Sequence, residues 1–505
     1  MQPALDVGDR PPRSGSRPAG PLVVVSNRLP YDLRRDGGGR SPKRNVGGLV
    51  NAVEPALSRL GGSWVGWDGT VHPSHAAVVA EMSRPLVCET PGGVRLLGVP
   101  LSERELARYY HGFANRCLWP LFHGFLERSV FEPEDHAIYL RVNRRFAEVT
   151  AAKAGAGGRA WVHDYHLLLV PLFLRQLGFE GTVDFFLHIP FPPAEVFRAL
   201  PWREELLEGL LASDSVAFHT ELYRNNFVES ARQILGVEVG PSGPEGAIRL
   251  ARGERQTRVL VAPIGIDVED FERVASLPSV LERSRRIREA HGNRRILFSA
   301  DRLDYTKGVG ERLLAVEQFL SSRPRFDRRV VLLQVLVPSR NQVEQYRQMK
   351  REIDREVGRI NGELGHSGWV PIHYRYRALE REELVAHYLA ADAALVTPLR
   401  DGMNLVAAEF AASRVDESGV LVLSEFAGIA AHCQQALVVN PYDIEGFCRA
   451  LDRAFEMDPQ ERRARMAALR ERVRSNPVHR WAGRCLGYAP TSERVAAEAL
   501  RDLEA

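Results

Sequence analysis

Residues 295–308 read RILFSADRLDYTKG, and this stretch decides which fold the rest of the chain predicts. The apolar run at its start is typical of a buried strand, and Arg302, Asp304 and Lys307 follow where that strand would end. Open parallel sheets bind ligands beyond the carboxyl ends of their strands, so a polar cluster in this place is a candidate site. The plain alternative is a surface loop whose Asp/Lys pair contributes under about 1 kcal/mol.

The lysine of this stretch is unusual for the chain. Only four lysines, Lys43, Lys153, Lys307 and Lys350, occur among 67 basic residues. A compact ammonium group makes a point-charge contact with a phosphate oxygen that a planar guanidinium does not reproduce. The lysine usage therefore favours a phosphate contact for Lys307.

Strand-like and helix-like segments alternate on both sides of this stretch. Short apolar runs such as LVVVS, AWVHD and VDFFLHIP precede amphipathic stretches, and six more apolar runs follow the same order from residue 295 onward. This alternation predicts parallel sheets covered by helices on both faces. We expect an α/β protein with two doubly wound, Rossmann-like domains that face a central cleft. The expected segments are a disordered leader (1–20), an N-terminal domain (21–267), a C-terminal domain (268–475) and a helical tail (476–505).

Composition limits the possible partners. The 505 residues are 45% hydrophobic and 26% charged, and 67 basic and 64 acidic residues spread through the chain give a net charge of +3. No basic block predicts a nucleic-acid or membrane-surface partner. Five scattered cysteines without CxxC spacing argue against disulfides or a zinc site and favour a reducing cytoplasm. The N-terminus lacks a signal-peptide core, and the strongest apolar run is too short to span a membrane, so we expect neither secretion nor insertion.

A second candidate is LVTPLRDGMNLVAAEF, residues 395–410. The pattern predicts a strand, a turn through Asp401 and Gly402, and a helix that starts near Asn404. The unpaired amides and partial positive charge of a helix N-terminus suit a diphosphate. Glu409 would lie on that helix with its carboxylate placed to accept hydrogen bonds from ribose hydroxyls. The alternative is an ordinary Asp-Gly turn followed by a solvated glutamate.

The N-terminal half offers weaker signals. Arg28 stands at a strand end, and Gly47 and Gly48 precede a helix, which allows close approach of the backbone to an anion. The glycines do not form GxGxxG, so a dinucleotide site is not indicated. Asp164 and His188 end two successive strands, where they could bind sugar hydroxyls, although such a histidine is more often a core residue.

Aromatic side chains and one further arginine complete the candidates. Tyr110 and Trp119 could offer ring faces and polar tips to a sugar, or could simply pack a helix into the core. Arg340 follows another strand end and could grip a phosphate bidentately, or cap a helix. The histidines beside Asp164 lack a third ligand at a recognisable spacing, so no metal site is predicted.

Many separated motifs together resemble one family. The stretches VVVSNRLP, WVGWDG, WVHDYHLL, FFLHIPFP, PIGID, RLDYTKG, TPLRDGMNLVAAEF and NPYD closely resemble trehalose-6-phosphate synthases, the retaining glycosyltransferases of family 20. The resemblance runs in order over roughly residues 21–485. It implies a GT-B fold in which the C-terminal domain binds an NDP-glucose and the N-terminal domain binds glucose 6-phosphate. It also implies no cofactor, no catalytic metal, and a dimer or tetramer as in many relatives.

The resemblance assigns each candidate a role. The donor-binding set is Gly48, His188, Arg302, Lys307, Asp401, Gly402, Met403, Asn404, Leu405, Val406 and Glu409. The acceptor-binding set is Arg28, Tyr110, Trp119, Asp164 and Arg340. The catalytic set is Asp164, His188, Arg302, Lys307 and Asp401. In this family the acceptor hydroxyl attacks from the face that the diphosphate leaves, so fixed cations are needed and a protein nucleophile is not.

Several alternatives stay open at this point. The donor base is unreadable, which leaves UDP-, GDP- and ADP-glucose. Related activities are glucosylglycerol-phosphate synthesis and the coupling of a cyclitol phosphate, and a catalytically silent sugar-phosphate sensor is a possibility from another class. The intact RLDYTKG and DGMNLV motifs favour the glucosyltransferase. His432 and Cys433 stand where the family more often has Glu-Leu, and no DxDx[TV] phosphatase signature follows.

Overall fold

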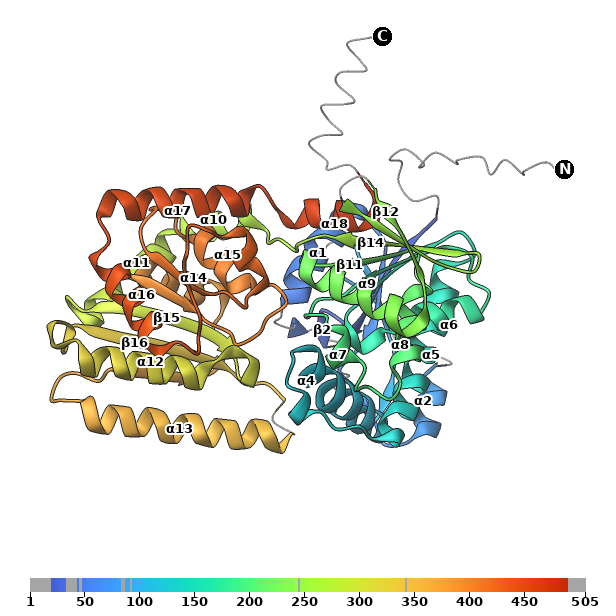
Figure 1. Cartoon of the computed structure of the whole chain (residues 1–505), viewed down its shortest axis with the longest axis horizontal. Helices are drawn as coiled ribbons and strands as arrows, with labels where there is room; N and C mark the ends of the chain where they lie inside the picture. Colours follow the sequence, from blue (N-terminus) through green and yellow to red (C-terminus); the bar gives the residue numbers. More distant parts are fainter. Residues whose placement is uncertain are drawn as a thin grey trace, which may run out of the picture.

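The computed structural model describes residues 20–32, 43–44, 48–82, 87–90, 93–243, 246–340 and 343–488. Within them the chain forms two halves that lie side by side, each built on its own sheet (Figure 1). Most of the predicted leader and residues 489–505 of the predicted helical tail lie outside the described residues. No helix of the described part is both long and apolar enough to cross a membrane.

The C-terminal half is built on a six-stranded parallel sheet in the order β17–β16–β15–β18–β19–β20. Its strands are β15 (Arg295–Arg302), β16 (Val330–Val337), β17 (Ile372–Tyr376), β18 (Ala393–Val396), β19 (Val420–Ser424) and β20 (Leu437–Val439). All six fall on the predicted apolar runs. Strand order reverses between β15 and β18, and in such sheets the crevice at the reversal is the place where ligands bind.

The N-terminal half is built on a ten-stranded sheet. In spatial order its strands are β12 (Glu238–Ser242), β13 (Ile248–Arg252), β14 (Arg255–Val261), β11 (Ser215–Phe218), β10 (Thr182–Phe186), β9 (Arg159–His163), β1 (Leu22–Arg28), β4 (Ser63–Trp67), β7 (Arg95–Gly98) and β6 (Val87–Glu89). The strands from β14 to β7 are parallel, whereas β6, β12 and β13 pair antiparallel at the edges. Here the order reverses between β1 and β9. The prediction of two doubly wound α/β sheets is confirmed.

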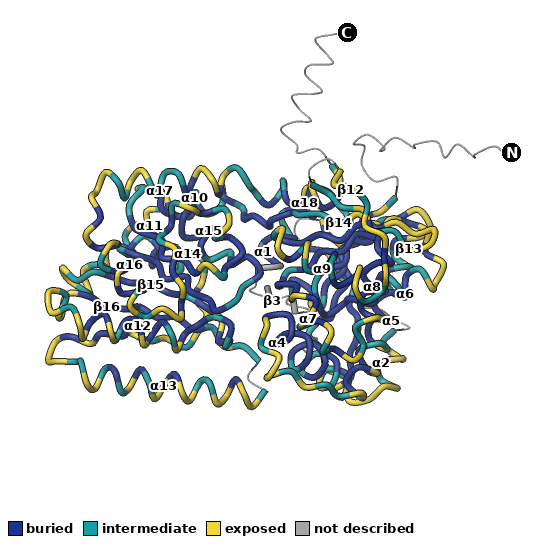
Figure 2. The backbone as a smooth tube through the Cα atoms, in the orientation of Figure 1, coloured by how far each residue is buried: buried dark blue, intermediate teal, exposed yellow. Residues whose placement is uncertain are grey.

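Helices cover both sheets. The main helices of the N-terminal half are α1 (Gly48–Leu60), α2 (His75–Met82), the π-helix η1 (Leu106–Leu118), α4 (Trp119–Phe122), α5 (Pro133–Ala154), α6 (Val170–Gln176), α8 (Arg203–Leu211) and α9 (Glu221–Leu235). Those of the C-terminal half are α10 (Val268–Ala275), α11 (Pro278–His291), α12 (Val309–Ser322), α13 (Glu344–Leu364), α14 (Arg381–Ala390), α15 (Leu405–Ser413), α16 (Ile444–Glu456) and α17 (Pro459–Arg474). Figure 2 shows buried backbone through the middle of each half and exposed backbone on the outer helices, as expected for sheets buried on both faces.

The chain crosses between the halves twice, and the two crossings lie together. After α17 it returns to the N-terminal half as α18 (Val478–Leu486), which packs against α1. The N–H of Val478 donates to the carbonyl oxygen of Ile266, which belongs to the first crossing. Trp481 of α18 is fully buried with its ring centroid 5.0 Å from that of Trp161. We propose that the two domains meet at these crossings, near residues 267 and 475.

Candidate active site

The candidate site begins where β15 ends at the reversal of the C-terminal sheet. After Arg302 a short 3-10 turn, η5 (Tyr305–Lys307), leads to Gly308, whose φ is 63°. A Cβ at Gly308 would lie 2.5 Å from the carbonyl oxygen of Thr397, so the tight entry into α12 requires glycine. This turn directs Lys307 at the loop after β18, where its Nζ lies 2.5 Å from Oδ2 of Asp401.

The loop after β18 carries most of the predicted donor set. Burial alone would raise the pKa of Asp401, but the ammonium of Lys307 lowers that pKa below its usual range. Nδ2 of Asn404 donates to the same carboxylate oxygen at 3.0 Å. Gly402, Met403 and Asn404 are buried, and Leu405 and Val406 are half-buried.

The same loop leads into α15 without a side-chain cap. Asn404 has φ 69°, and its side chain makes no hydrogen bond to the first turn of the helix. The first turn of α15 also contains no acidic residue. Unpaired amides and the positive end of the helix dipole therefore lie next to the ammonium of Lys307, which is an arrangement suited to an anion.

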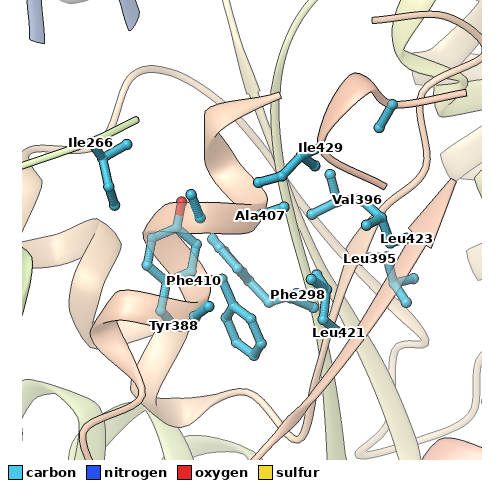
Figure 3. Close-up of a cluster of buried hydrophobic side chains, with 14 of the residues drawn as sticks. Ile266, Phe298, Tyr388, Leu395, Val396, Ala407, Phe410, Leu421, Leu423 and Ile429 are labelled. Carbon is cyan, nitrogen blue, oxygen red and sulfur yellow. The ribbon is translucent and has the colours of Figure 1, made fainter. Parts of the chain in front are cut away.

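Glu409 is held in the interior by the packing of α15. Figure 3 shows Ala407 and Phe410 of this helix among the buried side chains of the neighbouring strands, including Phe298. Glu409 is 9% exposed and accepts a hydrogen bond from the hydroxyl of Tyr388 at 3.1 Å. Burial raises the pKa of this carboxyl to about 7. The alternative of a solvated glutamate is therefore wrong.

The raised pKa of Glu409 gives the unliganded protein a pH-dependent stability. An unfolded glutamate loses its proton near pH 4.5, whereas the folded one keeps it up to about pH 7. This contribution is present below pH 4.5 and is lost as the pH rises through 7. We expect Glu409→Gln, which needs no buried charge, to raise the stability by roughly 3 kcal/mol at pH 8 and to change it little at pH 4. Urea unfolding at both pH values measures this, and an equal change at the two values would contradict it.

Asp304 joins the two halves at the next point of the site. Its fully buried carboxylate accepts hydrogen bonds from the backbone and hydroxyl of Thr306, and lies 2.7 Å from the guanidinium of Arg340. Nε1 of Trp119, which belongs to the N-terminal half, donates to it at 3.3 Å. Burial opposes ionisation, but Arg340 and Arg302 hold the pKa of Asp304 below its usual value.

The ring of Trp119 makes cation–π contacts with Arg302 and Arg340. The guanidinium carbon of Arg340 lies 4.2 Å from the ring centroid and that of Arg302 lies 5.6 Å from it. The side chain of Arg340 is only 3% exposed. Arg302, in the part of the chain that the structure describes, forms no close ion pair, although its charge lowers the pKa values of Asp304, Asp164 and Asp401.

The N-terminal half contributes Asp164 and His188. Asp164 directly follows β9 with φ 75°, and its Oδ1 accepts the backbone N–H of His188 at 3.2 Å. Burial raises the pKa of Asp164 to about 7. Nε2 of His188 lies 3.1 Å from Nδ1 of His163. Burial lowers the pKa of His163 to about 3 and that of His188 well below its usual value, so both rings are neutral.

The remaining candidates lie at the same edge of the N-terminal sheet or above it. Arg28 ends β1, with its guanidinium carbon 5.1 Å from the ring centroid of Trp67. Tyr110, in η1, stacks on His166 at 5.7 Å. Gly48 begins α1, and Gly47 lies outside the described residues.

The donor loop rests directly on the N-terminal half. A Cβ at Gly402 would lie 2.2 Å from the carbonyl oxygen of His188, and the hydroxyl of Tyr223 donates to the carbonyl oxygen of Asp401 at 2.9 Å. The structure therefore brings His188 to the Asp401 loop, and brings Trp119 to Arg302 and Arg340. In the described residues no group of three or more His, Cys, Asp or Glu side chains is arranged to hold a metal ion.

Sequence reasoning missed the residues that support the site. Tyr346, in α13, donates to Asp304 at 3.2 Å, and Tyr165 accepts from Arg340 at 3.3 Å. His163 contacts His188, although WVHDYH suggested it only as a poor metal ligand. The density of aromatic and polar side chains around Asp164 was a local signal for His163 and Tyr165, and Tyr346 had none.

Comparisons with known proteins agree with this geometry. The family model described as "Glycosyltransferase family 20" matches residues 20–489. A bifunctional trehalose-6-phosphate synthase/phosphatase of Thermoproteus tenax is 46% identical over 96% of this chain, which spans 66% of that protein. A trehalose-6-phosphate synthase of a Mycobacterium sp. (strain KMS) is 43% identical over 95% of this chain and 97% of its own length.

A solved structure matches at the level of the fold. The α,α-trehalose-phosphate synthase (UDP-forming) of Burkholderia xenovorans, in complex with glucose 6-phosphate, aligns with a TM-score of 0.84 and 34% identity over 96% of this chain and all of its own. The predicted GT-B fold is thereby confirmed. With two doubly wound sheets, and a family match over almost its whole length, this chain belongs to glycosyltransferase family 20.

Proposed function

We propose that this chain transfers glucose, with retention of configuration, from an NDP-glucose to glucose 6-phosphate and so makes α,α-trehalose 6-phosphate. The observation that carries the proposal is the pair of Lys307 and Asp401 beside the uncapped start of α15. This cation and these amides lie where a departing nucleoside diphosphate would need them.

Departure of the diphosphate creates the charge that the site must stabilise. Lys307, Arg302 and the first amides of α15 are fixed before the reaction, so they would stabilise that charge without rearranging. The loop Gly402–Val406 would wrap the donor, and Gly48 would approach it from the N-terminal half. Asp401 and His188 would hold the donor glucose, and Glu409 would accept hydrogen bonds from the ribose.

The acceptor would bind above the N-terminal sheet. Arg28, Tyr110 and Arg340 would receive its phosphate, and Trp119 and Asp164 would contact its sugar. Because the pKa of Asp164 is about 7, its carboxyl is present in both protonation states near neutral pH and can donate to or accept from a sugar hydroxyl. The hydroxyl that attacks would pass its proton to an oxygen of the leaving phosphate, so no carboxylate nucleophile is needed.

The proposal also covers the nucleobase of the donor, the oligomeric state of the protein and its cellular compartment. The Burkholderia relative is UDP-forming, which makes UDP-glucose the first donor to test. A homodimer or homotetramer is our expectation for the assembly. All five cysteines are unpaired, which fits a reducing cytoplasm.

The test is a matrix of donors and acceptors. UDP-, GDP- and ADP-glucose are each combined with glucose 6-phosphate, glycerol 3-phosphate and validamine 7-phosphate, and nucleoside diphosphate release and product mass are measured. Release with glucose 6-phosphate and a product with the mass of trehalose 6-phosphate support the proposal. Release with glycerol 3-phosphate alone would overturn it in favour of glucosylglycerol-phosphate synthesis.

A further inference from the structure

A cavity of about 270 Å³ lies where the chain crosses between the two halves. The first crossing, residues 263–266, and the second crossing, residues 472–484, both contribute to its walls. Met403, Ala408 and Ile429 of the C-terminal half form its apolar side. The cavity, which is partly open to solvent, is thus lined by both crossings and by the loop of the candidate active site.

The polar side of this cavity is strongly basic. Arg472, Arg480 and Arg484 all line it, and none of the described lining residues is acidic. Arg480 donates to the backbone oxygen of Ser475, and within the described part of the chain none of the three guanidiniums forms an ion pair with a carboxylate. Arg472 and Arg484 are exposed and Arg480 is half-buried, so water weakens their mutual repulsion, and an anion between them would offset what remains.

His432 adds a hydrogen-bond donor that lacks an acceptor. Arg472 donates to Nδ1 of His432 at 3.0 Å, so Nδ1 is the unprotonated nitrogen and the ring proton is on Nε2. Nε2 is buried and has no hydrogen-bond partner among the described residues. Burial, together with the charges of Arg472 and Arg484, lowers the pKa of His432, so the ring is neutral and keeps this tautomer. A buried N–H without an acceptor is costly, and an oxyanion in the cavity would satisfy it.

We propose that this cavity is a second anion site, which binds the phosphoryl group of a small phosphorylated metabolite between the two halves. Arg472 and Arg484 would bind the phosphoryl oxygens as charge-assisted donors, and Nε2 of His432 would donate to one of them. An adjoining hollow shares His432, Arg472 and Ser475 with this cavity and adds Gln434, Gln435 and Glu471, so the carboxylate of Glu471 belongs to that hollow. The carboxylate of Glu221 in α9 acts on His432 but is not a lining residue of the cavity. The volume suits a phosphate ester or diphosphate of a small molecule rather than a complete nucleotide sugar.

The proposed site is separate from the diphosphate position of the active site. Lys307 and Asp401 are not among its lining residues, whereas the side chain of Met403 is. The donor loop therefore contacts the active site on one face and this cavity on the other. An anion here would join both crossings to that loop and so act on the angle between the halves.

Isothermal titration calorimetry with inorganic pyrophosphate, and with inorganic phosphate in a second arm, tests this site. The protein is first saturated with UDP-glucose, which is too large for the cavity, and glucose 6-phosphate is left out because the cavity itself would bind this small phosphate ester. We expect saturable binding in the wild type, and an affinity of the cavity at least about tenfold lower in Arg472→Gln and in Arg484→Gln, because each loses a charge-assisted hydrogen bond. Probe that binds at the acceptor-phosphate position of the active site is recognised because neither substitution weakens it. Tighter binding of pyrophosphate than of phosphate would identify a diphosphate as the preferred ligand, and the reverse order a monoester.

The matched control is Arg463→Gln, an exposed arginine of the same helix α17 that does not line the cavity, and it should bind as the wild type does. Melting temperatures without the probe verify that all variants fold. No saturable binding, or equal binding in all three variants and the wild type, would overturn the proposal. The substituted arginines line the cavity and do not belong to the proposed active site. The binding result therefore does not depend on whether the chain is a glucosyltransferase or on which nucleotide it uses.

Discussion

Replacing Lys307 by alanine is expected to lower kcat at least about 100-fold, because it removes a fixed cation that, in the proposed function, faces the leaving diphosphate. In the structure its ammonium is held by Asp401 and lies next to the uncapped start of α15. The amides of α15 remain in the variant, so some stabilisation of the developing charge persists. The measurement is the initial rate of nucleoside diphosphate release at saturating donor and acceptor.

Two further variants separate this charge from other causes. Lys350 forms an exposed ion pair with Asp354 in α13, so Lys350→Ala removes a lysine of the same kind away from the cleft and should react at the wild-type rate. Lys307→Arg keeps the positive charge beside Asp401 and tests whether a planar group can replace a compact one. A folded Lys307→Ala variant with a near-normal kcat would mean that the rarity of lysine in this chain carries no functional information.

The C-terminal sheet could be predicted strand by strand because its strands are buried on both faces. β16 is apolar apart from Gln334, and β19 is apolar up to Ser424, so their sequence alone separates them from the amphipathic helices around them. The edge of the N-terminal sheet was less readable. Strands β4 and β7 are short and contain glycine, and the π-helix η1 has no distinct sequence pattern.

The sequence could predict which candidate residues lie at strand ends, but not which side chains contact one another. Arg302, Asp164 and His188 each follow an apolar run, and strand ends of parallel sheets meet at one edge. The hydrogen bond from Trp119 to Asp304 joins residues 185 positions apart, and no local pattern reports it. The return of α18 to the N-terminal half was also unreadable, because an amphipathic helix does not reveal which half it packs against.

Gly402→Ala is expected to lower turnover about 100-fold or more without unfolding the protein. The added Cβ would lie 2.2 Å from the carbonyl oxygen of His188, and that atom belongs to the backbone and cannot rotate away. The loop that carries Asp401 must then move off the N-terminal half by a large fraction of an ångström. Misplacement of reacting groups by about 1 Å costs roughly two orders of magnitude in rate, so the effect should fall mainly on kcat.

Gly310→Ala is the matched control for this change. Gly310 is an exposed residue of α12 with nothing within 4 Å of its added Cβ, so alanine should leave the rate unchanged and stabilise the helix by about 0.5–1 kcal/mol. If Gly402→Ala loses activity and Gly310→Ala does not, glucose transfer occurs with the donor loop in contact with the carbonyl oxygen of His188. A normal rate in Gly402→Ala would mean instead that the two halves react from a more open arrangement, in which His188 does not reach the donor sugar.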